Sequence, residues 1–237
     1  MSTPWEIRPL ASQAEFTACT ELQEATWGRG FTERVPTAIL LVNQKIGGVT
    51  AGAFTPDSTL AGFVFGMTGV RNGQLVHWSD MLAVRPAFRG SGMAEALKRY
   101  QADQCRTLGV SVMLWTYDPL VARNAHFNLN KLGASIDSFV ENMYGSGTGS
   151  VLMGALPTDR FIAAWALDGS ARRAPAPSVE QVRVRIPDDW ESIVASDPAA
   201  AQGWRERTRS EFRRLFADGW RVTGFDRTQG YTFSHDG

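Results

Sequence analysis

The chain has 237 residues, of which 43% are hydrophobic and 20% are charged, as is usual for a globular protein with one sizeable core. Its 24 Lys plus Arg residues balance its 24 Asp plus Glu residues, so no excess charge points to a nucleic-acid or membrane partner. The apolar runs are too short to span a bilayer, and the N-terminus shows no secretory signal pattern.

The first 84 residues alternate between strand-like and helix-like patterns. "WEIRPL" predicts a strand, and "SQAEFTACTELQEATWG" predicts a helix capped by Ser12. "PTAILLVNQ" indicates a further helical turn. Three strand-like runs follow, "GGVTAGAFT", "STLAGFVFGMTGV" and "QLVHWSDMLAV", and residues 71–73 predict a hairpin turn between the last two.

Beyond residue 84 the pattern continues to alternate. A helix opens in "RGSGMAEALKRYQ", a buried strand follows in "SVMLWTY", and the helix of "PLVARNAHFNLNKLG" is closed by Gly133. "ASIDSFVENMYG" and "RFIAAWAL" predict a final antiparallel pair. This order of elements indicates an α/β fold with a mixed sheet.

The composition changes at residues 168–178, "DGSARRAPAPS", which has the character of a linker. A strand, a helix around "GWRERTRSEFRRLF" and two further strands follow it. The helix carries an apolar stripe and an arginine stripe at steps of three and four residues. The apolar stripe is Trp204, Thr208, Phe212 and Leu215 or Phe216, and the arginine stripe is Arg205, Arg209 and Arg213. Because the apolar stripe must be buried, we expect this segment to pack on the rest of the chain or on a partner subunit.

Residues 89–94, "RGSGMA", lie where a strand gives way to a helix. The first N–H groups of a helix lack intrahelical acceptors and carry the positive end of the helix dipole, and glycines let the backbone approach a ligand. With Arg89 adding positive charge, the segment predicts a phosphate or pyrophosphate site. An ordinary strand-to-helix turn is the alternative, since glycines serve it equally, and no Rossmann or Walker A motif is present.

The surroundings of this loop resemble the cofactor-binding region of the GNAT acyltransferase superfamily. "MLAV", a proline and "FRGSGMAEALK" are similar to the superfamily's Q/R-x-x-G-x-G/A motif through Arg89, Gly92 and Ala94. "NAHFNLNKLGA" is similar to its A-x-x-L-Y-x-K-x-G-F helix through Ala125, Lys131 and Gly133. The resemblance covers about the first 168 residues and implies a GNAT-type, mostly antiparallel mixed sheet flanked by helices, followed by a small C-terminal α+β extension.

The resemblance implies an acyl-CoA co-substrate, with acetyl-CoA as the first candidate, and no metal. In such folds the pantetheine amides pair with the backbone of the strand before the motif, which here is Leu82, Ala83 and Val84. The pyrophosphate would lie on the amides of Arg89, Gly90, Ser91, Gly92, Met93 and Ala94. Asn124 either reaches the pantetheine or a bound water, or caps the start of its helix.

The implied reaction is direct transfer of the acyl group to an amine, which requires a group that takes up a proton. Strand alternation predicts Trp78, Asp80 and Leu82 on one face and His77 on the other. Superfamily members often carry His, Glu or Asp at the positions of Trp78 and Asp80, so Asp80 is the candidate base or ammonium anchor. An internal ion pair with an arginine is the alternative for Asp80, and His77 is expected to be a packed core residue.

One departure from the superfamily concerns the general acid. The usual tyrosine stands four residues before the glycine, and Leu129 occupies that position. Tyr144 is the candidate replacement, Tyr117 and His126 are the alternatives, and each of the three also has a purely structural explanation. The missing tyrosine leaves open an acyl-CoA-binding sensor without turnover. A nucleotide-binding oxidoreductase needs a parallel sheet, which the antiparallel run before Val84 disfavours.

These features together predict a catalytic domain at residues 1–168, a linker at 169–178 and an extension at 179–237 packed on the core. The neutral, Trp-rich chain favours a small-molecule amine acceptor, without nucleic acid or membrane, and a homodimer is the oligomer we expect if one forms. Cys19 and Cys105 predict buried, reduced thiols and therefore a cytoplasmic protein.

Overall fold

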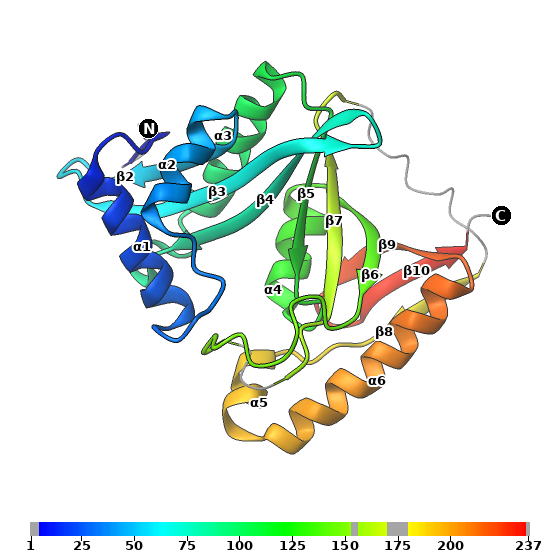
Figure 1. Cartoon of the computed structure of the whole chain (residues 1–237). Coiled ribbons are helices and arrows are strands. Elements are labelled where there is room, and N and C mark those ends of the chain that lie inside the picture. The colour runs from blue at the N-terminus through cyan, green and yellow to red at the C-terminus, as the bar shows by residue number, and fades with distance from the viewer. Residues whose placement is uncertain (1–4, 153–155, 170–179, 236–237) are drawn as a thin grey trace. The chain divides into compact units, whose positions relative to one another are not determined.

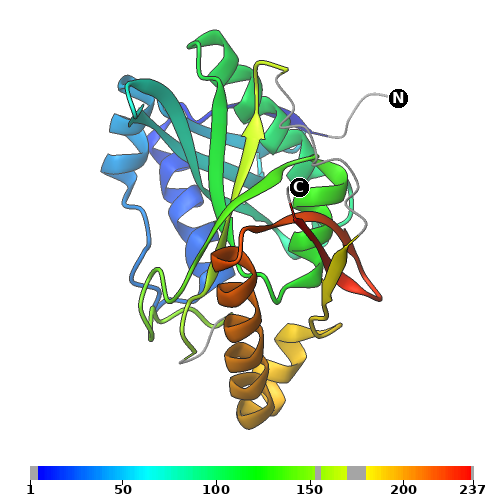
Figure 2. The same ribbon diagram turned by 90° about the vertical axis from the view of Figure 1, so that its right-hand side faces the viewer.

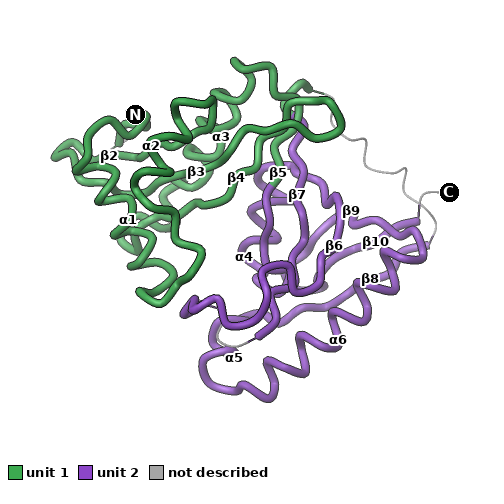
Figure 3. The backbone as a smooth tube through the Cα atoms, viewed as in Figure 1, with its two compact units in different colours: residues 1–114, 167–169 green, residues 115–166, 170–237 purple. Residues whose placement is uncertain are grey.

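The computed structural model describes residues 5–152, 156–169 and 180–235. The chain forms two compact units, which Figure 3 colours separately. Unit 1 comprises residues 1–114 and 167–169, and unit 2 comprises residues 115–166 and 170–237. Beyond Gly169, the expected linker lies outside the described residues.

Unit 1 is a meander of strands with helices on both faces (Figure 1). Its strands, in the sheet order β1-β2-β3-β4-β5, are β1 (Glu6–Pro9), β2 (Val49–Phe54), β3 (Leu60–Arg71), β4 (Gln74–Val84) and the first half of β5 (Val112–Tyr117). Its helices are α1 (Gln13–Trp27), α2 (Thr37–Lys45), the short 3₁₀ turn η1 (Pro86–Phe88) and α3 (Met93–Thr107). β4 and β5 pair in parallel, and the other neighbours pair antiparallel.

The two faces of the unit 1 sheet pack against different helices. A Cβ at Gly62 would meet Met93 and Leu97 of α3, whereas the ring of the next residue, Phe63, contacts Trp27 of α1 at 6.3 Å between centroids. Because successive strand residues point to opposite faces, α3 covers one face and α1 the other. We call these the α3 face and the α1 face.

Local sequence signals account for the ends of these elements. Ser12 and Glu15 form a capping box at the start of α1, and Asn72 and Gly73 have φ of 54° and 76° in the β3–β4 turn. Both positive φ values are those of a two-residue hairpin turn that asparagine and glycine favour. The predicted cap and the predicted hairpin are therefore confirmed.

One buried cluster of the unit 1 core lies on the α1 face. Its buried cluster consists of Leu10, Phe16, Cys19, Leu22, Leu40, Phe54, Leu60, Phe63, Phe65, Met81 and Ala83. Cys19 and Cys105 are both buried and free, as the sequence predicts, and burial raises the pKa of each thiol to about 12. Such thiols are packed apolar groups and do not act as nucleophiles near neutral pH.

Unit 2 contains a three-strand segment, a second small sheet and its helices (Figures 1 and 2). The end of β5, β7 (Arg160–Ala166) and β6 (Ser135–Val140) lie in the order β5-β7-β6, and β6 and β7 are antiparallel as predicted. The second sheet is antiparallel and has the order β8-β10-β9, from β8 (Gln181–Val184), β9 (Trp220–Asp226) and β10 (Gly230–His235). The helices are α4 (Ala122–Ala125), the π-helical segment η2 (His126–Lys131), α5 (Trp190–Ser196) and α6 (Pro198–Ala217).

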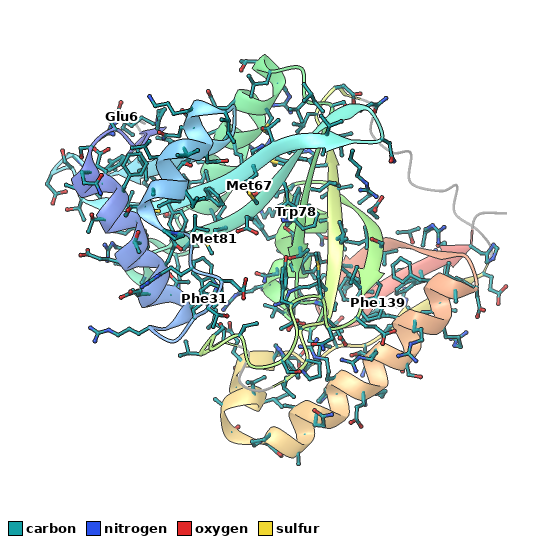
Figure 4. All side chains as sticks on the ribbon, in the orientation of Figure 1. Glu6, Phe31, Met67, Trp78, Met81 and Phe139 are labelled. Atoms are coloured by element: carbon teal, nitrogen blue, oxygen red, sulfur yellow. The ribbon has the colours of Figure 1, made fainter. Side chains whose placement is uncertain are left out.

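Helix α6 packs its apolar stripe on strands β6 and β7 within unit 2. Phe212 lies 4.8 Å from Phe161 and 5.5 Å from Phe139 between ring centroids, and Tyr231 lies 5.2 Å from Phe161 (Figure 4 labels Phe139). Thr208, Phe212 and Leu215 are buried as the spacing predicts. Residues 180–235 therefore bury their apolar side chains against residues 115–166.

The arginine stripe of α6 is divided between core and surface. Arg205 is only 1% exposed and pairs with Asp118 through two hydrogen bonds of 3.0 and 2.6 Å, whereas Arg213 is 62% exposed and pairs with Glu141. Helix α5 and the π-helical geometry of η2 were not predicted. Within the described residues, no helix combines the length and the apolar composition that crossing a membrane requires.

Candidate functional site

Strand β4 is paired on both edges only near its start. It pairs with β3 from Gln74 to Val84, but with β5 only over residues 76–78. In the described part of unit 1, residues 79–84 therefore have one edge without a strand partner, and Leu82, Ala83 and Val84 lie in this stretch. An extended ligand can form hydrogen bonds with the backbone along such an edge.

A β-bulge interrupts β4 at Asp80. Ser79 faces Gly66 across the β3–β4 pair and Met81 faces Phe65, so the one residue between Ser79 and Met81 has no partner on β3. A bulge bends its strand and changes the direction of the side chains around it. It places the candidate catalytic residue at the irregular point of the strand.

The bulge changes which side chains share a face. Ser79, directly before the bulge, lies on the α3 face, where its hydroxyl accepts a hydrogen bond from Lys98 of α3. Met81, directly after the bulge, belongs to the core cluster on the α1 face. Trp78 pairs with Met67 on the α1 face, while Leu82 pairs with Val64 on the α3 face.

The prediction that Trp78, Asp80 and Leu82 share one face is therefore wrong for Leu82, because simple alternation does not hold across a bulge. Asp80 has no partner in this register, but the Trp78 side chain donates a hydrogen bond to its carboxylate, which associates Asp80 with the α1 face. In Figure 4, Met67, Trp78 and Met81 lie along the same side of β3 and β4.

The Asp80 carboxylate remains accessible to solvent while protein atoms crowd around it. This desolvation raises its pKa, a hydrogen bond from the Trp78 side chain opposes the rise, and the negative charge of Glu33 in the α1–α2 loop adds to it. Asp80 forms no ion pair with an arginine of the described residues, so the expected structural alternative is absent there. A carboxylate with a raised pKa is a better base than an ordinary aspartate.

His77, by contrast, is fully buried on the α3 face, as predicted for a core histidine. Its Nε2 lies 3.0 Å from Nε2 of Gln101, and its Nδ1 lies 3.0 Å from the Thr68 hydroxyl. Burial, followed by the charge of Lys98, lowers its pKa to about 4, so the ring is neutral at physiological pH. His77 therefore has no role as an accessible base.

The loop after β4 has an open backbone. Gly90 and Gly92 have φ of 77° and 87°, and an added Cβ at either would meet no atom within 4 Å. The Ser91 hydroxyl donates to the Phe88 carbonyl at 2.6 Å and so holds the loop against η1. Arg89 is exposed beside it.

Helix α3 begins at this loop without a side-chain cap. Gly92 is its N-cap, and the first helical hydrogen bond runs from Ala96 N–H to the Gly92 carbonyl. The N–H groups of Met93, Ala94 and Glu95 therefore lack intrahelical acceptors and point out of the helix end. Together with the glycines, they form an uncapped row of donors that suits an anion.

In unit 2, Asn124 lies on the short helix α4 and is half-buried. The N-cap of α4 is Val121 rather than Asn124, and no side chain caps it. The capping alternative for Asn124 is therefore wrong. Its side chain makes no hydrogen bond within the described part of the chain, so its amide is available to a ligand.

The candidate acids of unit 2 differ in exposure. Tyr144 is 37% exposed, and its hydroxyl lies 3.1 Å from the Thr116 hydroxyl. Tyr117 is buried, accepts a hydrogen bond from Tyr231 at 3.3 Å, and has a pKa that burial raises well above its ordinary value. His126 is half-buried at the start of η2, and Leu129 lies within that π-helical segment. Of the two tyrosines, Tyr144 is the one that solvent reaches.

Sequence reasoning did not find the bulge or the buried Lys98–Ser79 contact. The adjacent polar residues Ser79 and Asp80 directly before the apolar run of residues 81–84 were the available signal. Such a pair does not reveal a bulge by itself, because register depends on the partner strand.

No protein-family model matches the chain, and no curated protein matches it. Solved structures do match. The structure of yncA from Salmonella typhimurium with its cofactor acetyl-CoA has a TM-score of 0.55 and 19% sequence identity, covering 75% of this chain and 100% of that one. A GNAT superfamily phosphinothricin acetyltransferase from Sinorhizobium meliloti in complex with acetyl-CoA has a TM-score of 0.55 and 16% identity, covering 75% and 96%.

Arabidopsis thaliana Naa50 in complex with the bisubstrate analogue CoA-Ac-MVNAL has a TM-score of 0.54 and 14% identity, covering 69% of this chain and 99% of that one. The chain thus spans nearly the whole of each of these structures and has a further part that they do not match. The chain therefore has the fold of the GNAT N-acetyltransferases, which the sequence resemblance predicted.

Proposed function

We propose that the chain is an acyl-CoA-dependent N-acyltransferase, with acetyl-CoA as the first donor to test. The observation that carries the proposal is the succession of two open backbone stretches in unit 1, which the short 3₁₀ turn η1 separates. The free edge of β4 at residues 79–84 leads into an uncapped glycine loop at the start of α3. An extended amide chain ending in a pyrophosphate matches this succession in its order of chemical groups.

In this proposal, pantetheine amides pair with the backbone of Leu82, Ala83 and Val84. The pyrophosphate lies on residues 89–94, with the Arg89 guanidinium as a counter-charge. Since the Arg89 and Ser91 N–H groups donate to the Pro86 and Phe88 carbonyls, the donors left for it are those around Gly92 and the start of α3. Asn124 contributes its amide to the pantetheine or to a bound water. No metal takes part in this mode of binding.

The reaction we propose is direct acyl transfer. The nitrogen of a neutral amine attacks the thioester carbonyl, the C–N bond forms, and the C–S bond breaks with departure of the thiolate. The Asp80 carboxylate accepts the amine proton, directly or through water, or anchors the acceptor as an ammonium ion before it is deprotonated. Tyr144 donates its hydroxyl proton to the departing thiolate in this scheme.

The acceptor we propose is a small-molecule amine. Asp80 and Glu33 supply negative charge on the α1 face, and the half-buried Trp78 and the 43%-exposed Met67 supply apolar surface beside it. A cationic amine with an apolar body would bind through its charge to the carboxylates and through its body to the apolar surface. Naa50 is named with a peptide-containing analogue, so peptides belong in the test.

The decisive experiment measures free thiol released from acetyl-CoA and longer acyl-CoAs with a panel of small amines and N-terminal peptides. Sustained, amine-dependent thiol release supports the enzyme. Coenzyme A binding without release from any pair supports the second candidate, an acyl-CoA sensor, which Leu129 at the usual tyrosine position favours. Stabilisation by NAD rather than coenzyme A would contradict both.

We expect Asp80→Asn to lower kcat by about a hundredfold or more, because the amide can neither accept the proton nor pair with an ammonium ion. Acyl-CoA affinity should change little, since Asp80 lies on the α1 face. Steady-state kinetics across pH 6 to 9, a window of about the range in which an acceptor-side carboxylate matters, tests this. Asp103→Asn, an exposed surface change on α3, is the matched control. Equal turnover by both variants would remove Asp80 from the site.

We expect Tyr144→Phe to lower turnover by about tenfold with unchanged acyl-CoA affinity, because a thiolate leaves even without full protonation. Tyr117→Phe should leave turnover intact and cost about 1 kcal/mol of stability through the lost hydrogen bond with Tyr231. Thiol release and thermal unfolding of the two variants separate these effects. The opposite pattern would assign the acid to Tyr117, and wild-type rates in both would leave proton donation to water.

The domain organisation we infer is a catalytic domain at residues 1–168 and an extension at 179–237 that covers it, joined through residues 169–178. The contacts of α6 with β6 and β7 support the packed extension. We expect a cytoplasmic protein, because its two cysteines are free and buried.

A further inference from the structure

A buried polar contact joins α3 to β4 one residue before the Asp80 bulge. Lys98 and Ser79 are 5% and 3% exposed, and the Lys98 Nζ donates to the Ser79 Oγ at 2.7 Å. One turn further along α3, Gln101 reaches His77 at 3.0 Å. Two residues of α3 therefore hold the two β4 residues that face them, directly before the strand becomes irregular.

The opposite strand leaves space for the neighbouring contact between Gln101 and His77. Gly66 of β3 is the partner of Ser79, and a Cβ there would lie 2.3 Å from Nε2 of His77 and 2.6 Å from Nε2 of Gln101. Any side chain at this position would displace the polar groups. The absence of a side chain at Gly66 thus leaves the space in which the side chains of His77 and Gln101 contact each other.

A buried lysine at this position makes the free energy of folding less favourable. Burial disfavours its ammonium form and lowers its pKa to about 7. An apolar residue of similar length would fill the same space without this penalty, and such replacements are often neutral or stabilising. Packing alone therefore does not explain a lysine here.

We propose that Lys98 is a positioning residue for the acyl transfer: by holding Ser79 on the α3 face, it fixes the bulge that directs the Asp80 carboxylate to the α1 face. This inference rests on the proposed role of Asp80. Lys98 also belongs to the helix whose N-terminus forms the proposed pyrophosphate site. The contact thus ties the acceptor-side carboxylate to the cofactor-side helix through one hydrogen bond.

The test is Lys98→Met, which keeps the length of the side chain and removes the donor. We expect kcat to fall by about ten- to hundredfold, because a displacement of the order of 1 Å has such an effect. Affinity for coenzyme A should be unchanged, and the melting temperature should equal or exceed that of the wild type. Lower activity without lower stability separates positioning from a merely structural role. Lys45→Met, on the exposed end of α2, is the matched control and should leave kcat and stability unchanged.

Ser79→Ala removes the other partner and should lower kcat by a similar factor, while Ser79→Thr, which keeps the hydroxyl, should restore most of it. If both residues act through one contact, the Lys98→Met/Ser79→Ala double variant should be no slower than the slower single variant. Wild-type kcat in Lys98→Met, or losses in the double variant that multiply, would overturn the inference while leaving the proposed function intact.

Amide hydrogen exchange supplies a readout that needs no turnover. In Lys98→Met, the amides of residues 79–81 should exchange faster than in the wild type, while those of β2 stay unchanged. If the wild type releases no thiol with any acceptor, the proposed function fails. Faster exchange at the bulge would then still support Lys98 as the residue that fixes it, and unchanged exchange would overturn that as well.

Discussion

Arg205→Met should lower the free energy of unfolding by about 3–5 kcal/mol, because it removes the only arginine that is hydrogen-bonded to the buried Asp118 carboxylate among the described residues. Asp118 and Arg205 are 5% and 1% exposed and share two hydrogen bonds, so water cannot replace the lost partner. Arg160 lies 3.9 Å from Asp118 and is too distant for a hydrogen bond. In thermal unfolding, this loss corresponds to a melting temperature lower by about 10 °C for a chain of this size.

Arg213→Met is the matched control on the same helix. Arg213 is 62% exposed in its pair with Glu141, and we expect a change within about 0.5 kcal/mol. Asp118→Asn keeps a side-chain oxygen that can accept the hydrogen bond from Leu120 N–H and removes the charge, so adding it to Arg205→Met should recover part of the lost stability. Equal effects of Arg205→Met and Arg213→Met would show that the buried pair does not anchor α6.

Gly92→Glu should abolish the stabilisation of the protein by coenzyme A. At a hundredfold excess over its dissociation constant, the ligand should add about 2.7 kcal/mol to the wild type, which is about 5–10 °C in melting temperature. The glutamate would place a carboxylate at the N-cap of α3, where the phosphates must lie, and its Cβ would strain a backbone with φ of 87°.

Gly109→Glu controls for both the charge and the strain. Gly109 is exposed just beyond the other end of α3, has φ of 78°, and would meet no atom with an added Cβ. This variant should lose some stability without ligand but keep the full shift with coenzyme A. Isothermal titration of both variants gives the affinities directly. Unchanged coenzyme A affinity in Gly92→Glu would place the pyrophosphate elsewhere.

Most helices and strands and their order could be predicted from the sequence, because their signals are local; helix α5 was the exception. The capping box of Ser12 and Glu15 marks the start of α1, and Asn72 with Gly73 specifies the hairpin between β3 and β4. The glycine loop before α3 is equally local, since only glycine adopts positive φ there without strain. The resemblance carried by Arg89, Gly92 and Ala94 and by the helix that contains Lys131, together with the order of elements, was enough to predict the fold.

The features that could not be predicted from the sequence depend on residues that are far away in the chain. The bulge at Asp80 exists because β4 has one residue more than β3 between two facing positions, and no period within β4 shows this. Helical spacing assigns Arg205 and Arg213 to one stripe. Arg205 is buried in a pair with the Asp118 carboxylate, which is 87 residues away in the chain. Arg213 stays at the surface, where it pairs with Glu141. The sequence left two roles open for Asn124, a helix cap or an amide available to a ligand. Because the N-cap of α4 is Val121, Asn124 does not cap the helix, and its amide stays available. Local sequence patterns determine where a helix or strand begins and which periodicity it has. The environment of the side chains that take part in chemistry depends on the residues that the fold places next to them.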